Sequence, residues 1–354
     1  MMKKSALLVA MFSLILGTWS FANAEEPIKL KFASGFPPMH RNTVMMDKFS
    51  KELTAKSNGK LEITHLGGST LLNMPKMASG VQTGVADFGL SHISYSAGRF
   101  PVSEVMELPV GFPSPWVGAH AMIDFTEKYK PKEWDAYQLL MISSSPICVP
   151  QTLKKPVKTL EDFKGMKIRA QGRIADVTAA LGGVPMPLEI VDVYEALRRG
   201  VLDGNLGNYE QLKGFKFGEL LKYVTAVVNV SMVNVFYVVM NKNKFNSLPE
   251  DMKKLVIDFS KEFNEEWARS WCEIEIEGKE FFLQQGGEVL QLPDAETARW
   301  EKAVQPVFDK YKTDMVAKGH KAEEVDAWLK FLKERTEYWK EQQKAKKIES
   351  AYKF

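Results

Sequence analysis

The chain has 354 residues, of which 45% are hydrophobic, and it carries 47 lysines and arginines against 44 aspartates and glutamates. This length is sufficient for two domains that each bury a core. The formal net charge is only +3 and the basic residues are interspersed with acids, a pattern that argues against a nucleic-acid-binding protein.

Residues 1–24 predict a secretory signal peptide. Lys3 and Lys4 precede an apolar run over residues 6–16, and Ala22-Asn23-Ala24 has the small-x-small pattern of a cleavage site. The apolar run is short for a membrane span, and a retained amphipathic anchor is the alternative. Cleavage after Ala24 removes two lysines and no acid, which lowers the net charge from +3 to +1. We therefore expect a soluble protein that is exported to the periplasm.

Strands and helices alternate along the first part of the mature chain. Alternating apolar residues predict strands, and apolar residues at helical spacing predict the helices between them. The expected strands are 28–35, 61–66 and 86–92, and the expected helices are 43–57 and 74–83. Such an order predicts parallel βαβ units in a sheet covered on both faces. In these sheets ligands bind beyond the carboxyl ends of the strands.

A second domain is expected to begin near Val149, where a long apolar strand over residues 137–149 ends. A strand through Met166–Ala170 follows, with helices over 174–181 and 191–199. The β-branched run 226–241 predicts one or two strands that return the chain to the first domain. The expected domains are therefore 25–149 with 234–275, and 150–233 with 276–354.

The segment from Ser247 to Gly287 predicts one long helix. Pro249-Glu250-Asp251 is typical of a helix start, and Gly286-Gly287 is typical of a helix end. Apolar residues recur between them at helical spacing. A helix of roughly 36 residues would be about 50 Å long and would span both domains. The alternative is two helices broken between Glu275 and Gly278.

Motifs for catalysis or metal binding are absent from the sequence. The five histidines have no close metal-ligand spacing, and there is no G-x-S-x-G, P-loop or dinucleotide-binding pattern. We therefore expect no enzyme activity, no cofactor and no metal; the alternative is a catalytic pair among the abundant carboxylates that the fold brings together in space. Cys148 and Cys272 are the only cysteines. Both lie in apolar surroundings and are expected to be buried free thiols, although export would permit a disulfide between them.

Arg169 is the most informative candidate for a binding residue. It ends a strand just before a helix, so its guanidinium is expected to point into the ligand-binding crevice of an α/β fold. The planar fork of an arginine binds a carboxylate with two hydrogen bonds. The alternative is an arginine on a solvated strand end, paired with Asp162 or Glu189.

Over nearly its full length the mature chain resembles the solute-binding proteins of tripartite ATP-independent periplasmic (TRAP) transporters, in the dicarboxylate-binding-protein-like family. The stretches that carry the resemblance are, in order, LKFASGFPPMH, NGKLEITHLGGSTL, GVADFGLSHISYSAGRFP, KKPVKTLEDFKGMKIRAQG, VYEALRRGVLDG and NKNKFNSLPEDMKK. The resemblance implies a two-domain clamp with a long helix shared between the domains. It also implies an organic-acid ligand whose carboxylate is bound by Arg169, and membrane permease subunits as partners.

The chain departs from the family pattern at two places that bear on the ligand. Members often have an asparagine in register after the V-D-G element, whereas Asn205 and Asn208 here are only approximate counterparts. Many members carry a second arginine in the strand that is here the apolar run 146–150. A second buried negative charge would then lack a cation to offset its desolvation. We therefore expect a monocarboxylate with an apolar or aromatic body.

Loops at the strand ends supply further candidates for ligand contact. They are Phe36, His92, Tyr95, Gln171, Asn234 and Phe236. Each aromatic residue could equally belong to the core, and His92 could be a structural histidine. Trp116 and His120 are assigned to the core. The expected protein is a monomer that captures its solute for a transporter. The alternatives are a ligand sensor for a membrane receptor and an exported enzyme that acts on small acids.

Overall fold

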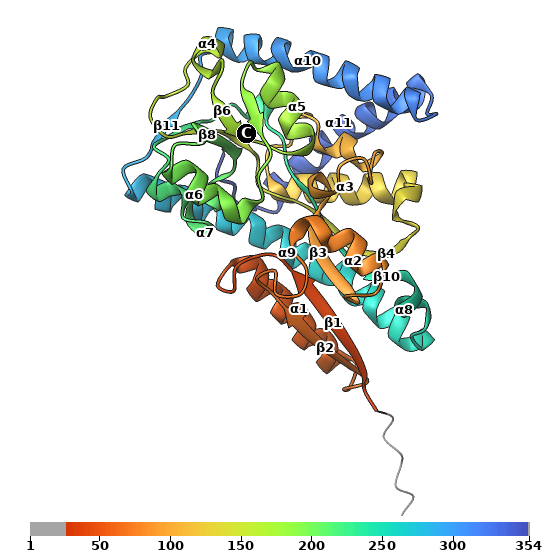
Figure 1. The fold of residues 1–354 in the computed structure, drawn as a ribbon. Coiled ribbons are helices and arrows are strands. Elements are labelled where there is room, and N and C mark those ends of the chain that lie inside the picture. The colour runs from red at the N-terminus through yellow and green to blue at the C-terminus, as the bar shows by residue number, and fades with distance from the viewer. Residues whose placement is uncertain (1–25, 353–354) are drawn as a thin grey trace, which may run out of the picture.

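The computed structural model describes residues 26–352, so the predicted signal peptide lies outside the described residues. Two sheets organise this part of the chain (Figure 1). We call the parts built on them the five-stranded lobe and the six-stranded lobe. The mixed α/β class and the two-part clamp are as predicted.

The five-stranded sheet has the order β2-β1-β3-β10-β4. Its strands are β1 (Ile28–Ser34), β2 (Leu61–Leu66), β3 (Phe88–His92), β4 (Tyr137–Ser144) and β10 (Val235–Asn241). The helices of this lobe are α1 (Arg41–Lys56), α2 (Met77–Gln82), α3 (Pro115–Tyr129) and α8 (Lys242–Asn246). β1 is parallel to β2 and β3, as predicted, whereas β10 is antiparallel to β3 and β4. The orientation of β10 differs because it re-enters this sheet from the other lobe.

The six-stranded sheet has the order β11-β9-β5-β8-β6-β7. Its strands are β5 (Val149–Thr152), β6 (Lys167–Arg169), β7 (Val184–Met186), β8 (Gly204–Gly207), β9 (Tyr223–Thr225) and β11 (Glu288–Leu290). Its helices are α4 (Leu160–Phe163), α5 (Gly172–Ala180), α6 (Val193–Arg198), α7 (Tyr209–Gly214) and α10 (Asp294–Ala317). The last helix, α11 (Ala322–Ala345), packs on both α3 and α10.

The single strand predicted over residues 137–149 is wrong, because β4 ends at Ser144 and β5 begins at Val149. Residues 145–148 instead connect the lobes, next to the returning segment 232–234. The N–H of Ser145 donates to the carbonyl of Asn234, and the N–H of Cys148 donates to that of Met232. The two connections therefore form a paired crossing. The domain boundaries predicted nearby remain a prediction.

α9 (Glu250–Gln284) is one helix of 35 residues, so the predicted long helix is confirmed and the broken alternative is wrong. It packs on α1, α3 and β4 in one lobe and on α7 in the other. Figure 1 shows it running from α8 to α7. Gly278 does not break it. A Cβ there would lie 2.1 Å from the carbonyl oxygen of Tyr209, so the glycine allows α7 to approach.

Two further observations describe the fold as a whole. Cys148, in the paired crossing, and Cys272, on α9, are buried free thiols. Among residues 26–352, no helix combines the length and the hydropathy needed to cross a membrane.

Candidate ligand-binding site

The cavity between the lobes forms where several strand ends meet. β1, β3 and β4 of one sheet and β6 and β8 of the other deliver their carboxyl ends there. β10 is antiparallel to its neighbours, so its amino end lies at the same edge, with Phe236 paired to His92. Loops at this edge are where an α/β sheet places ligand-binding groups. The cavity is lined by Phe36, Met74, His92, Tyr95, Ser145, Arg169, Ile190, Asn208, Glu210, Gln211, Phe215, Asn234, Phe236 and Trp271.

Arg169 contributes the charge of the six-stranded lobe to this cavity. It is the last residue of β6 and is 5% exposed. Its Nε donates to the carbonyl oxygen of Leu188 at 3.1 Å, and its Nη2 donates to the hydroxyl of Tyr95 at 3.4 Å. These two bonds hold the guanidinium in one orientation and leave the N–H groups of Nη1 without a partner among residues 26–352.

Arg169 has no carboxylate within ion-pair distance in the part of the chain that the structure describes. The alternative pairing with Asp162 or Glu189 is wrong. Asp162 instead completes a capping box with Thr159 at the start of α4. Glu189 accepts a hydrogen bond from Asn73. A buried guanidinium without a counter-charge is costly unless a ligand supplies that charge.

His92 and Tyr95 flank the guanidinium from the five-stranded lobe. Burial, and secondarily the charge of Arg169, lower the pKa of His92 well below its ordinary value, so this imidazole is neutral at physiological pH. The Tyr95 oxygen accepts the N–H of Ile190 at 3.1 Å, which leaves its own O–H free to donate. Arg169 is therefore the one full positive charge among the described residues that line the cavity.

Four aromatic side chains form the apolar wall of the cavity: Phe36, Phe215, Phe236 and Trp271. The Phe36 ring centroid lies 5.8 Å from that of Phe236 and 6.4 Å from those of Phe215 and Trp271. These spacings are typical of packed aromatic pairs. The rings come from both lobes and from α9, so an apolar ligand body between them would touch all three parts of the molecule.

Seven of the nine residues predicted as ligand contacts line the cavity, and two do not. Asn205 is fully buried in β8, and its Nδ2 donates to Gln211 Oε1 at 2.7 Å and to Gln151 Oε1 at 3.2 Å. Gln171 donates through Nε2 to the carbonyl of Leu188 at 2.7 Å. Gln171 therefore supports the same carbonyl that orients Arg169. Contact between any of these residues and a ligand remains a prediction.

The other cavity residues were not predicted from the sequence: Met74, Ser145, Ile190, Glu210, Gln211, Phe215 and Trp271. Trp271 was recognised only as part of the apolar face of the long helix. Glu210 carries no local signal, because carboxylates are abundant along the chain. The one usable clue is that Glu210 and Gln211 lie two and three residues after Asn208 of the V-D-G region.

A buried carboxyl group lies behind Asn234. The Ser94 hydroxyl donates to Glu107 Oε1 at 2.5 Å, and the N–H of Val235 donates to the same atom at 3.2 Å. The amide of Asn234 donates to the Ser94 oxygen at 3.3 Å. Burial raises the pKa of Glu107 to about 8. This carboxyl group therefore carries a proton at neutral pH for much of the time.

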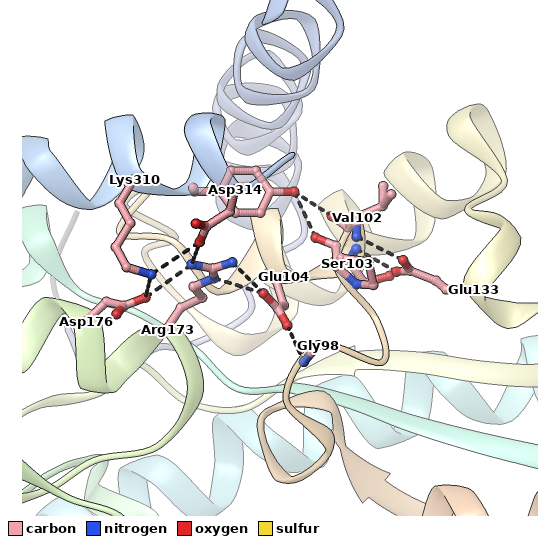
Figure 2. Close-up of polar contacts among 11 residues, drawn as sticks. Gly98, Val102, Ser103, Glu104, Glu133, Arg173, Asp176, Lys310 and Asp314 are labelled. Carbon is pink, nitrogen blue, oxygen red and sulfur yellow. Dashed lines mark hydrogen bonds and ion pairs between the residues drawn. The ribbon is translucent and has the colours of Figure 1, made fainter. Parts of the chain in front are cut away.

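A second polar cluster joins the lobes away from the aromatic wall. Figure 2 shows the guanidinium of Arg173, on α5, between Glu104, Asp176 and Asp314. Its Nη2 lies 2.7 Å from Glu104 Oε2 and its Nη1 lies 3.0 Å from Asp314 Oδ2. Glu104 belongs to the turn 103–107, which contacts β10. This ion pair therefore ties the six-stranded lobe to the five-stranded lobe.

The two lobes and the cavity between them define a binding protein of the clamp type. Residues 32–314 match the family described as bacterial extracellular solute-binding protein, family 7. The chain therefore belongs to this family, that of the solute-binding proteins of TRAP transporters. Among residues 26–352 no group of histidines, cysteines or carboxylates is arranged to hold a metal ion.

Individual relatives agree with this assignment. The 2,3-diketo-L-gulonate-binding periplasmic protein of Escherichia coli K12 is 25% identical over 267 residues, which cover 74% of this chain and 80% of that protein. A TRAP periplasmic solute-binding protein from Desulfovibrio salexigens, in an open form, is 30% identical, with a TM-score of 0.76 over 86% of this chain and 95% of its own. A TRAP protein from Bordetella bronchiseptica with bound mandelate is 23% identical, with a TM-score of 0.81 over 88% and 100% of the two chains.

Proposed function

We propose that this protein captures an organic acid outside the inner membrane and delivers it to the membrane permease of a TRAP transporter. The observation that carries the proposal is Arg169, a buried guanidinium that faces an aromatic-lined cavity without a carboxylate partner among the described residues. A ligand carboxylate would supply that partner with charge-assisted hydrogen bonds. Residues Phe36, His92, Tyr95, Asn208, Asn234 and Phe236 are proposed to complete the contacts.

We further propose that the solute is a monocarboxylate with an apolar or aromatic body. Among the described residues that line the cavity, Arg169 alone carries a full positive charge, and Glu210 would repel a second carboxylate. The aromatic wall suits a ring or a branched chain. Mandelate, which the Bordetella bronchiseptica protein binds, is an acid of this kind.

The function is proposed to be binding without catalysis, in a monomer that closes around its solute by a hinge motion. Export with cleavage after Ala24 fits the family but concerns residues outside the described range. The proposed domains are 25–149 with 234–275, and 150–233 with 276–354, and the paired crossing at 145–148 and 232–234 supports the first boundary.

Calorimetric titration with succinate and malate against phenylacetate, mandelate and branched aliphatic monocarboxylates tests this proposal. We expect the monocarboxylates to bind at least about tenfold more tightly, because a second buried charge lacks a cation. Tight binding of succinate would contradict the monocarboxylate proposal. Mass spectrometry of the acid after long incubation should show no turnover, and a chemically altered acid would contradict a pure binding role.

A further inference from the structure

The cavity contains a second polar group whose hydrogen-bonding capacity is only partly used. Glu210, in the first turn of α7, is 4% exposed and lines the cavity. Its Oε1 lies 2.5 Å from Nε2 of His40, which comes from the other lobe. Its Oε2 has no hydrogen-bond partner among residues 26–352.

The proton on His40 can be placed from its neighbours. Its Nδ1 accepts a hydrogen bond from the backbone N–H of Asn42 at 3.1 Å, so Nδ1 carries no hydrogen and the imidazole is neutral. Nε2 therefore donates to Glu210 without cancelling its charge. Three cations, Arg41, Lys213 and Lys216, line an outer pocket together with Glu210. Arg41 and Lys213 pair with Glu277, and none of the three forms an ion pair with Glu210 among the described residues. Glu210 is thus a buried carboxylate that has one neutral partner and one free oxygen.

Gln211, the next residue, also presents an unused group to the cavity. The orientation of the Gln211 side-chain amide follows from a series of hydrogen bonds that begins at the backbone carbonyl of Asn208. Gln151 Nε2 donates to the carbonyl of Asn208 at 2.9 Å, so Gln151 Oε1 accepts from Asn205. Asn205 Nδ2 also donates to Gln211 Oε1. The amide nitrogen of Gln211 is left without a partner in the described part of the chain. Asn205 is in this way a positioning residue for the cavity.

We propose that Glu210 and Gln211 form a second subsite, which binds a hydroxyl group on the solute at a distance from its carboxylate. A hydroxyl group donates one hydrogen bond and accepts others, so it can satisfy Glu210 Oε2 and Gln211 Nε2 together. An ammonium group only donates and would leave the Gln211 amide unmatched. Arg169 and Glu210 both line the cavity and do not pair with each other, so each is available to a different polar group of one molecule. This inference rests on the proposed binding of a carboxylate at Arg169, and it narrows the solute to a hydroxy acid.

Calorimetry with phenylacetate, 3-hydroxyphenylacetate and 4-hydroxyphenylacetate tests the subsite. We expect at least one hydroxy isomer to bind at least about tenfold more tightly than phenylacetate, because a hydrogen bond to a buried charged group is strong. The methoxy analogue of that isomer keeps the oxygen but cannot donate, and it should bind no more tightly than phenylacetate. An aminomethyl analogue that binds more tightly than both hydroxy isomers would overturn the assignment of a hydroxyl group.

Three variants test whether the preference for the hydroxy acid arises at Glu210 and Gln211. In Glu210→Leu the preference for the hydroxy acid should fall to within about twofold, since the charged acceptor is gone. Gln211→Met leaves the His40–Glu210 contact intact and should reduce the preference for the hydroxy acid by a smaller factor. This variant still tests the subsite if Glu210→Leu fails to fold. Glu195→Gln removes an exposed carboxylate of the same lobe that pairs only with Arg198 and Arg199, and it should leave the preference for the hydroxy acid unchanged.

The two proposals fail in different ways. Equal affinities for phenylacetate and both hydroxy isomers, with binding still dependent on Arg169, would overturn the hydroxyl subsite and leave carboxylate capture intact. Carboxylate binding that persists at full strength in Arg169→Ala would overturn the proposed capture of a carboxylate at Arg169 itself.

Discussion

Arg169 shows how one side chain can be held ready for a ligand before the ligand arrives. The carbonyl of Leu188 and the hydroxyl of Tyr95 orient it, and neither group neutralises its charge. Both partners are neutral, so the positive charge remains available to an anion. Little conformational entropy is then lost when a carboxylate binds, which favours affinity.

Replacing Arg169 with alanine should weaken binding of the carboxylate ligand by at least about 2 kcal/mol, the scale for truncating one partner of a buried charge pair. Calorimetry measures the affinity, and thermal unfolding should show that the variant still folds. Arg198→Ala is a matched control, because Arg198 is an exposed arginine of the same lobe that pairs only with Glu195. An affinity for the ligand equal in both variants would contradict the role of Arg169.

Glu107 should make the stability of the protein depend on pH. Its pKa rises from 4.5 to about 8 on folding, mainly because the carboxyl group is buried. The negative charge of Glu104 adds to this rise. The hydrogen bonds from Ser94 and Val235 and the positive charge of Arg173 oppose it. Between these values the folded state keeps a proton that the unfolded state releases, so the free energy of unfolding falls as pH rises. The contribution of Glu107 to the free energy of unfolding is fully present below pH 4.5 and is lost above about pH 8.

Urea unfolding of the wild type and Glu107→Gln at several pH values between 5 and 9 measures this effect. The glutamine resembles the protonated acid, so the variant should lose less stability over that range. Other titrating groups, including His92, act equally in both proteins and cancel in the comparison. Identical pH profiles for the two proteins would show that Glu107 does not titrate in this window.

At the scale of elements, α9 and the short helix α7 are joined at one point of very close approach. A Cβ atom on residue 278 would lie only 2.1 Å from the carbonyl oxygen of Tyr209. α7 also carries Glu210 and Gln211, so this contact sets the position of one wall of the cavity. A glycine that looked like a helix breaker in the sequence is therefore a packing requirement.

Gly278→Ala should destabilise the protein by about 1–3 kcal/mol, the range for overpacking, although alanine is the better helix former by about 1 kcal/mol. Urea unfolding measures the loss, and ligand affinity should fall with it because α7 is displaced. Lys261→Ala, at an exposed position of the same helix, should change stability by less than about 0.5 kcal/mol. An increase in stability in Gly278→Ala would show that the helices can separate at no cost.

Local patterns predicted most elements because periodicity depends on neighbouring residues. β2 is found at its predicted limits, and α9 ends within a residue or two of them. The prediction of one strand over 137–149 failed because it passed over the polar run 143–145 and Pro146, where the chain changes lobes between β4 and β5. Hydrophobic residues indicate that a segment is buried but not in which lobe. Because this segment is buried in both lobes, its composition does not show where the chain crosses between them.

The candidate site was predictable only where a strand end or a family pattern marked a residue. Arg169, His92 and Asn208 sit at such positions, and they line the cavity. Phe215 and Trp271 could not be distinguished from core residues, because the same aromatic side chains fill cores and cavities. Glu210 required the fold, since its significance depends on His40 from 170 residues away.

At the scale of the whole molecule, polar contacts join the two lobes at several points, and the Arg173–Glu104 ion pair is one of them. The side chain of Arg173 is 8% exposed and that of Glu104 is 13% exposed. Lys310 lies 3.2 Å from Asp314, so the cluster contains two cations and three carboxylates around one point. Separation of the lobes would break the bond to Glu104 and keep those to Asp176 and Asp314.

Arg173→Met should favour the open form and reduce ligand affinity by about fivefold or more, the lower range of coupling between distant sites. The reason is that the Arg173–Glu104 pair joins the two lobes, so its loss should lower the closed population and with it the apparent affinity. Small-angle scattering should give a larger radius of gyration for the ligand-free variant.

Arg299→Met is the matched control for this prediction, because Arg299 also binds two carboxylates, Glu161 and Glu296, but within one lobe. It should leave both the scattering and the affinity unchanged. If the Arg173 and Arg299 variants behaved alike, the ion pair with Glu104 would not control closure.

The burial of both native thiols has a practical consequence. Burial raises the pKa of Cys148 and of Cys272 to about 12, and thiol reagents react with the exposed thiolate. Maleimide dyes should therefore not react with the native cysteines. They should attach only to cysteines introduced at exposed positions, for example in place of Lys51 and Lys164. Energy transfer between two such dyes would report, one molecule at a time, how often the lobes approach each other with and without the acid.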